Sequence, residues 1–473
     1  MNEQDSSYEL KALHVLNELE RILECDPLID EVGFIHPSQF GTLNEEAHQL
    51  VLSSDDTSSS KISVVNASFW NKDHKLGIST EVLFPLYQRA KSAFMAATKQ
   101  YKALISNSSE NSSSSRDSIE TEVMNHSRAL VLLSCDFGTA WHSRKFVVSK
   151  KHPLSFFMYE LHLSALVLSY APKCEHAWSH RRWVIKSIAG RCPILQEILE
   201  KESELVEKIA ERSKMNYRAW NHRSWLVPYM STKQVLHELK KSRNWAGLHV
   251  ADNSCFHYRR RLMLRILEDS SDKLIIVSSE YTVDINQLWK EELEWNEMLI
   301  KLYVGREALW LHRRFLALVL IKRLSIDHHG LGEFVDNEFH LLTSCSTVPD
   351  SNFEDHQSQA LYSATYMLWS VKLLPQLHGI EFQEKLGAEN LKSFLNKACP
   401  EKSSLWDHLM GRDDLILILE KYNIAIESVS ESIYRHSGKG LTGFLNRRIP
   451  TWSLPQLEKG TLSSHIQIFL QKW

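Results

Sequence analysis

The chain has 473 residues, of which 43% are hydrophobic and 24% charged, and its formal net charge is −3. This composition is that of a folded protein with a large core, and it excludes the global basic field that nucleic-acid-binding proteins use. Gly and Pro are sparse, at 16 and 12 residues, which favours long helices over strands joined by turns.

Five segments are predicted in chain order. The first contains an amphipathic helix at residues 8–23, with leucines near helical spacing, and the second is rich in serine. The predicted segments are N-terminal helices of the stack (residues 1–105), a Ser-rich disordered insertion (106–118), five helical repeats (119–325), a loop-rich connection (326–360) and C-terminal helices (361–473).

The seven cysteines are scattered, and no two have the C-x-x-C spacing of a zinc or redox motif. The N-terminus is polar and acidic, unlike a signal peptide, and no apolar run is long enough to span a bilayer. We therefore expect a cytoplasmic protein with no integral membrane segment, no nucleic-acid partner and no metal bound by this chain.

An aromatic cassette recurs five times between residues 137 and 317. Its anchors lie at intervals of 37, 42, 36 and 54 residues. The five copies are FGTAWHSRKFVV, CEHAWSHRRWVI, NYRAWNHRSWLV, DNSCFHYRRRLM and REALWLHRRFLA, anchored at Trp141, Trp178, Trp220, Phe256 and Trp310. Such regular recurrence is typical of a repeat protein.

Each copy has an aromatic residue at position i, Arg at i+3 and an aliphatic residue or Met near i+7. On a helix these positions share one face. Because the intervals leave room for one more helix per copy, each repeat is predicted to be a helical hairpin. The predicted fold is all-α, an α-α superhelical, crescent-shaped solenoid of helical hairpins.

The Trp, His and Arg of the cassette can be read as a packing device or as a site. Ser143 stands where His is expected, and Phe256 and Tyr258 replace Trp and His in the fourth copy, which favours packing and bonds between hairpins. His176 and His180 have metal-ligand spacing, but no carboxylate or cysteine is expected to complete a set nearby, so a metal site is not expected there. The charged run KESELVEKIAERSK, residues 201–214, is expected to face solvent.

The segments PKCEHAWSHRRW and NYRAWNHRSW resemble the repeat of the protein prenyltransferase α-subunit family. The resemblance implies an α subunit that wraps around a β subunit, and it places zinc and the isoprenoid pocket in that partner. No cofactor is then expected in this chain. The implied reaction is attack of a substrate cysteine thiolate on C1 of an isoprenoid diphosphate, such as the co-substrate geranylgeranyl diphosphate.

The family also implies one catalytic residue in the α subunit, a Lys five positions before a repeat Trp. Here Pro172–Lys173 precedes Trp178 at that distance, so Lys173 is the candidate for stabilising the departing diphosphate. The next two positions depart from the family's pattern, because Cys174 replaces Asn and Glu175 replaces Tyr. An acidic side chain there puts the geometry around the diphosphate in doubt.

The remaining site residues implied by the resemblance form the repeats or contact the partner subunit. They are Trp141, Arg144, Trp178, His180, Arg181, Asn216, Tyr217, Trp220, His222, Arg223, Arg259, Trp310, His312 and Arg313. The irregular repeats, serine-rich insertion and helical tail resemble the repeat-containing, type III geranylgeranyltransferase branch of the family. That branch implies a Rab-type β subunit and, as protein substrate with a C-terminal cysteine, a farnesylated SNARE. The alternative is a helical-repeat scaffold that binds a partner without catalysis.

Overall fold

The computed structural model describes residues 3–40, 68–106, 113–150, 153–269, 274–278, 281–327, 331–346, 353–385 and 388–410. The chain divides into two compact units, residues 1–403 and 404–473. Only residues 404–410 of the second unit are described, so the part of the expected C-terminal helices beyond residue 410 lies outside the described residues. No helix in the described ranges has the length and apolar character that a bilayer-crossing segment requires.

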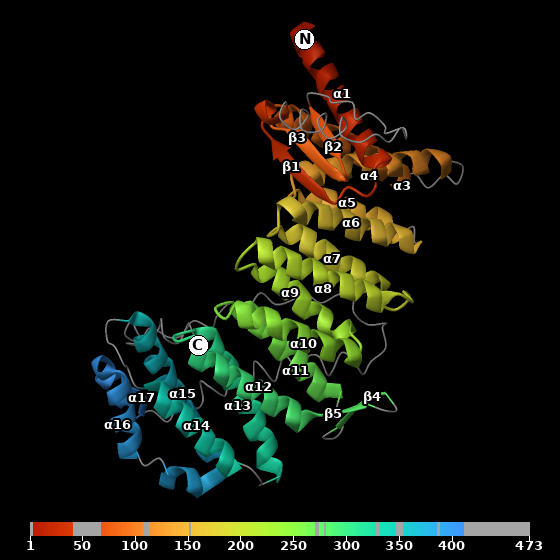
Figure 1. The fold of residues 1–473 in the computed structure, drawn as a ribbon. Helices are drawn as coiled ribbons and strands as arrows, with labels where there is room; N and C mark the ends of the chain where they lie inside the picture. The colour runs from red at the N-terminus through yellow and green to blue at the C-terminus, as the bar shows by residue number, and fades with distance from the viewer. Residues whose placement is uncertain are drawn as a thin grey trace, which may run out of the picture. The chain divides into compact units, whose positions relative to one another are not determined.

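Two-helix hairpins that follow one another in chain order form most of the first unit (Figure 1). The first helices of the hairpins are α4 (Ser113–Leu133), α6 (Leu154–Tyr170), α8 (Leu195–Arg212), α10 (Thr232–Leu248), α12 (Ile285–Leu302) and α14 (Leu331–Ser346). The second helices are α5 (Gly138–Lys150), α7 (Glu175–Ile188), α9 (Tyr217–Leu226), α11 (Asn253–Asp269), α13 (Glu307–Asp327) and α15 (Glu354–Lys385).

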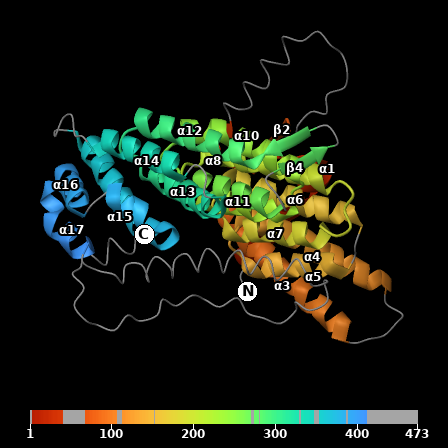
Figure 2. The ribbon, with the colours of Figure 1, turned by 90° about the horizontal axis from the view of Figure 1, so that it is seen from below.

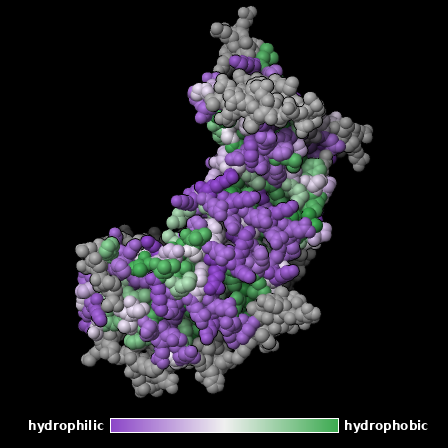
Figure 3. Space-filling view, in the orientation of Figure 1, coloured by the Kyte–Doolittle hydropathy of each residue, from purple (hydrophilic) through white to green (hydrophobic). Residues whose placement is uncertain are grey.

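The hairpins stack in two layers. Each first helix contacts its own second helix, and consecutive second helices contact each other from α5 to α15. Figure 2 shows α8, α10 and α12 on one side of the stack and α11 and α13 on the other. The prediction of an all-α fold built from helical hairpins is confirmed. On the face drawn in Figure 3, hydrophilic side chains cover much of the middle of the stack, with smaller hydrophobic patches among them.

Loops of equal length close the first five hairpins. Each has four residues, namely 134–137, 171–174, 213–216, 249–252 and 303–306. In the third loop Asn216 caps α9 by accepting a hydrogen bond from the Ala219 N–H at 3.2 Å. The third residue of the loop has positive φ in two of these loops: Met215 in the third loop, at 53°, and Gly305 in the fifth, at 74°.

The N-terminal part of the unit contains a small sheet in addition to helices α1 (Glu3–Cys25) and α3 (Leu83–Ser106). Strands β1 (Glu31–Ile35), β3 (Lys75–Ser79) and β2 (Phe69–Lys72) lie in that order, with β1 parallel and β2 antiparallel to β3. Asp73 and His74 join β2 to β3 with positive φ at both residues, the conformation of tight hairpins. This sheet was not predicted from the sequence.

Other elements differ from the sequence prediction in their boundaries. Helix α4 begins at Ser113, inside the stretch assigned to a disordered insertion, and residues 107–112 lie outside the described residues. Helix α14 occupies much of the segment expected to be loop-rich, because its apolar side chains, Leu341 among them, are buried. A two-stranded hairpin lies between α11 and α12. The remaining described elements are η1 (Val227–Tyr229), β4 (Leu274–Ser278), β5 (Tyr281–Asp284), α16 (Ala388–Ala398), η2 (Pro400–Lys402) and α17 (Ser403–Met410).

Candidate functional site

The aromatic anchors of the five cassettes are buried near the start of each second helix. Trp141, Trp178, Trp220, Phe256 and Trp310 are each at most 5% exposed. Two of the indoles also hold the loop before them, since Trp141 Nε1 donates to the Cys135 carbonyl at 2.8 Å and Trp178 Nε1 donates to the Pro172 carbonyl at 3.0 Å. These two anchors therefore fix both the helix and the loop that precedes it.

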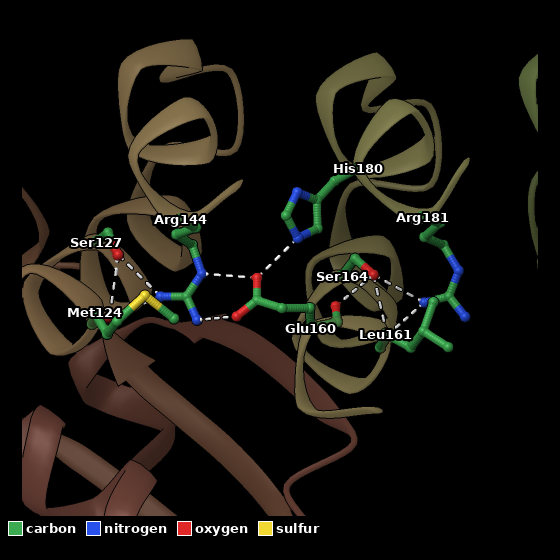
Figure 4. A network of polar contacts seen from close by, with 8 residues as sticks. All are labelled: Met124, Ser127, Arg144, Glu160, Leu161, Ser164, His180 and Arg181. Carbon is green, nitrogen blue, oxygen red and sulfur yellow. Dashed lines mark hydrogen bonds and ion pairs between the residues drawn. The ribbon is translucent and has the colours of Figure 1, made fainter. Parts of the chain in front are cut away.

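Each cassette arginine pairs with a buried glutamate on the first helix of the next hairpin. Arg144 Nε and Nη2 donate to the two carboxylate oxygens of Glu160 at 3.0 and 2.5 Å (Figure 4). This bidentate geometry suits a planar guanidinium, and it places full opposite charges in contact inside the stack. The five pairs are Arg144–Glu160, Arg181–Glu202, Arg223–Glu238, Arg259–Glu292 and Arg313–Glu338.

A third group, from the second helix of the same hairpin as the glutamate, contacts the same carboxylate. In three hairpins it is the cassette histidine, and in two a tyrosine. The contacts are His180–Glu160 at 2.7 Å, His222–Glu202 at 2.9 Å, Tyr258–Glu238 at 2.5 Å, His312–Glu292 at 2.9 Å and Tyr366–Glu338 at 2.8 Å. Each carboxylate thus joins the Arg of one hairpin to the His or Tyr of the next. We call these fifteen residues the carboxylate ladder.

The arginines of the ladder also reach back to the first helix of their own hairpin. Arg144 Nη1 donates to the Met124 carbonyl at 2.6 Å and to Ser127 Oγ at 2.9 Å (Figure 4). Arg181, Arg259 and Arg313 make the same bond to the carbonyl of the residue that follows the glutamate of their own hairpin. Such an arginine joins its own helix to two others, which is a structural role.

Burial and charge set the protonation of the ladder. Burial alone would raise the pKa of Glu160, but Arg144 and His180 outweigh it and lower that pKa to about 2. Glu202 and Glu292 have the same balance and the same pKa of about 2. Burial lowers the pKa of His180, although Glu160 opposes that shift. At neutral pH these three glutamates are therefore charged, and the buried histidines of the ladder are neutral.

The ladder ends without an unpaired charge. The glutamates of the second to fifth hairpins lie 20 residues before the His or Tyr that they accept from. At the start, Ser143 occupies the His position and the residue 20 before it is the buried Val123. At the other end, the residue after Tyr366, in the Arg position, is the buried Met367. Repeat arrays commonly have such atypical terminal units.

The five glutamates of the ladder were not predicted from the sequence. The constant interval of 20 residues between a Glu and the next cassette His was the available signal. The run KESELVEKIAERSK, expected to face solvent, contains Glu202, which is 2% exposed, so that expectation is wrong for this residue. The His176–His180 spacing does not describe a free ligand pair, because His180 Nε2 already contacts Glu160.

Lys173 lies apart from the ladder, as the third residue of the loop between α6 and α7. Its side chain is exposed, and no carboxylate of the described residues lies within ion-pair distance of its ammonium group. Its backbone is held in place, since Arg218 of the next hairpin donates to the Lys173 carbonyl. The loop thus presents a fixed backbone and an available cation.

The two unusual neighbours of Lys173 have partners of their own. Cys174 precedes α7 and directs its Sγ to the Cys135 carbonyl at 3.4 Å, as Asn216 directs its amide to the Pro172 carbonyl one hairpin later at 2.9 Å. Glu175 pairs with Arg182 at 2.6 Å and with Arg218 at 3.4 Å. Its charge is therefore compensated by two arginines, without Lys173. Tyr217, unlike Asn216, is 66% exposed.

The sequence of this chain is similar to those of several known proteins. The protein prenyltransferase alpha subunit repeat matches residues 157–188, 199–230 and 289–319, which correspond to the hairpins whose Trp-x-His-Arg cassette is intact. The protein prenyltransferase alpha subunit repeat-containing protein 1 of Homo sapiens is 30% identical over 236 residues, or 41% of this chain and 58% of that protein. Its namesake from Danio rerio is 32% identical over 224 residues, or 39% of this chain and 52% of that protein.

A more distant similarity is to a named transferase subunit. The geranylgeranyl transferase type-2 subunit alpha of Saccharomyces cerevisiae is 24% identical over 217 residues, covering 44% of this chain and 56% of that protein. The chain spans little more than half the length of the curated relatives it matches.

Proposed function

Because this chain carries the repeat of the protein prenyltransferase α-subunit family and is related to its repeat-containing members, we propose that it is the α-type subunit of a heterodimeric protein prenyltransferase. In this proposal a β subunit of the Rab type supplies the zinc ion and the lipid pocket. The pair transfers geranylgeranyl from its diphosphate to the cysteine of an acceptor protein, of which a farnesylated SNARE is the candidate. The site residues that pack the hairpins give the pair a stiff platform.

The single observation that supports a catalytic role is that the Lys173 side chain is exposed and has no carboxylate partner among the described residues. Its ammonium group is exposed on a loop of fixed backbone, while the nearby acidic group, Glu175, is engaged by Arg182 and Arg218. A cation free of carboxylate partners can approach a diphosphate carried by the partner subunit. As the C1–O bond breaks, negative charge grows on the leaving diphosphate, and a positioned ammonium group stabilises that charge.

The ladder itself offers no alternative catalytic group. Its glutamates are held by Arg together with His or Tyr, and its histidines are buried and neutral. Groups that are already hydrogen-bonded and shielded from solvent cannot bind a substrate without breaking the stack. The chemistry that this chain contributes is therefore assigned to its exposed loops.

The experiment compares three variants of the full chain, each co-purified with a Rab-type β subunit and assayed with labelled geranylgeranyl diphosphate and a protein acceptor. We expect Lys173→Ala to lower kcat by about 10²-fold or more, as loss of one charge-stabilising donor does. Lys173→Arg should retain part of the activity. The matched control is Lys214→Ala, which removes an exposed lysine from the next loop and should leave kcat unchanged.

The outcomes distinguish three parts of the proposal: the role of Lys173, catalysis by the pair, and binding to a β subunit. Transfer that is unaffected by Lys173→Ala would remove Lys173 from the reaction while keeping the enzyme assignment. A stable pair that transfers no isoprenoid to any acceptor would instead support the non-catalytic scaffold. Failure to bind any prenyltransferase β subunit would overturn the assignment as an α-type subunit.

A further inference from the structure

Two adjacent hairpin loops bring together two thiols and a carboxylate that are distant in sequence. Cys135 and Asp136 are the second and third residues of the loop between α4 and α5, and Cys174 is the last residue of the loop between α6 and α7. One ligand atom from each residue lies within 4.8 Å of the other two. Sequence spacing alone could not show this group, because Cys135 and Cys174 are 39 residues apart.

The group has few other partners. Cys174 Sγ lies 3.4 Å from the Cys135 carbonyl oxygen and 3.8 Å from Asp136 Oδ1. Within the described ranges, no Lys, Arg or His side chain forms an ion pair with Asp136. A carboxylate that faces two thiols without a cation is an arrangement in which a metal ion would be favourable.

The repeat does not need this chemistry to hold its loops together. One hairpin later the corresponding positions are Pro172, Lys173 and Asn216, and an ordinary amide-to-carbonyl hydrogen bond joins the two loops. The loop at Cys135 is also held independently by Trp141 Nε1, which donates to its carbonyl at 2.8 Å. The two thiols and the carboxylate are therefore particular to this pair of loops.

We propose that Cys135, Asp136 and Cys174 bind one Zn²⁺ ion at this place. Tetrahedral zinc has bonds of about 2.3 Å to sulfur and about 2.0–2.2 Å to oxygen, so its ligand atoms are roughly 3.5–3.8 Å apart. The three ligand atoms, within 4.8 Å of one another, need to converge by only about 1 Å. Binding releases both thiol protons to solvent, and the two thiolates and one carboxylate then carry three negative charges against the two positive charges of the ion.

Exposure gives the site an entry path and an open position. Cys174 is buried, Cys135 is half-buried and Asp136 is exposed, so the ion would approach from the Asp136 side. Three protein ligands leave the fourth tetrahedral position to water or to an incoming ligand. This zinc would be separate from the one that the proposed β subunit carries, and the inference does not depend on the proposed function.

The test uses the full chain without a partner subunit, titrated with Co²⁺ and then with Zn²⁺ in competition. We expect one Co²⁺ per chain with a thiolate-to-cobalt charge-transfer band, displaced by Zn²⁺. Cys135→Ser and Cys174→Ser should abolish the band and weaken zinc binding at least about tenfold, and Asp136→Asn should weaken it with the band retained. Since Ser is itself a good N-cap residue, Cys174→Ser should leave the helical content unchanged.

The matched control is Cys25→Ser, which removes an exposed thiol on α1 and should bind zinc as the unaltered chain does. Zinc should also protect Cys135 from alkylation and leave Cys25 reactive. The proposal is overturned if the chain binds no Co²⁺, or if the three site variants bind as tightly as the control. A disulfide between Cys135 and Cys174 in the purified chain that added zinc does not prevent would also overturn it, and would identify a redox pair.

Discussion

Replacing Glu160 by Gln tests whether the carboxylate ladder stabilises the stack. The change keeps the size of the side chain but leaves the buried Arg144 guanidinium without a counter-charge. Removing one partner of a buried ion pair costs about 3–5 kcal/mol. The pKa of Glu160 gives a similar value, since its fall from 4.5 to about 2 corresponds to roughly 3 kcal/mol at about 1.4 kcal/mol per pKa unit.

Because folded domains are stable by only about 5–15 kcal/mol, this loss would be a large share of the total. Urea unfolding followed by far-ultraviolet circular dichroism measures it directly. Arg144→Met should be similarly costly, while the double variant Arg144→Met/Glu160→Gln should cost at least about 1 kcal/mol less than the sum of the two single changes. The control is Asp30→Asn, which breaks the exposed pair with Lys75 and should cost less than about 1 kcal/mol.

If Glu160→Gln cost no more than the surface control, the buried ion pair would not stabilise the stack. Additive effects in the double variant would also contradict stabilisation by the pair, because they would mean that Arg144 and Glu160 stabilise the stack independently. Glu160→Gln can also be compared with Glu160→Leu. The amide oxygen of Gln can still accept a hydrogen bond from the His180 imidazole, whereas Leu cannot. Any extra loss in Glu160→Leu then measures the hydrogen bonds that the remaining oxygen accepts from His180 and Arg144.

Three further predictions concern other parts of the stack. Lowering the pH should destabilise the fold, because the buried His312 has its pKa lowered from 6.5 to about 4, and Glu160, Glu202 and Glu292 have theirs lowered from 4.5 to about 2. The contribution of these groups to stability is therefore fully present above about pH 6.5 and is lost as the pH falls through their pKa values in the folded state. A melting temperature that stays level or rises towards pH 3 would contradict these protonation states. Gly305→Ala should cost about 1–3 kcal/mol in urea unfolding, since φ is 74° and a Cβ would lie 2.6 Å from the Asp355 carbonyl oxygen, whereas Gly190→Ala, with nothing within 4 Å, should be nearly neutral. Tyr258→Phe should cost about 1.5–3 kcal/mol by removing a hydrogen bond to a carboxylate, and Tyr258→His should cost less because three other hairpins use His there; equal losses would count against the shared role.

The helices and their hairpin pairing could be predicted from the sequence because they depend on local pattern. An aromatic residue, an Arg and an aliphatic residue on one helix face specify which side is buried, and the long intervals require a second helix. The glutamates could not be found in this way. In isolation Glu202 looks like any residue of a charged surface helix, and it is buried only because Arg181 and His222 arrive from two other helices.

The sheet and the thiol group were missed for a related reason. Strands β1 and β3 pair across more than 40 residues of chain, and neither is long enough to give a clear alternating pattern. Cys135 and Cys174 are neighbours only because consecutive hairpins place their loops side by side. Lys173 was identified by its resemblance to a family pattern, and its pairing state became visible only in three dimensions.

The intervals between ladder residues are fixed inside a hairpin and variable between hairpins. The edge of the stack formed by the closing loops therefore has a constant length, whereas the edge formed by the connections between hairpins does not. Inside the second to fifth hairpins, Glu and the following His or Tyr are always 20 residues apart, and every closing loop has four residues. Between hairpins, the separation of Arg from the next Glu varies from 15 to 33 residues, and the longest case contains the β4–β5 hairpin. New segments can therefore be inserted along the connecting edge without disturbing the ladder. The loop edge, which carries Lys173, keeps its dimensions, so a partner that recognises it is unaffected by what the other edge acquires.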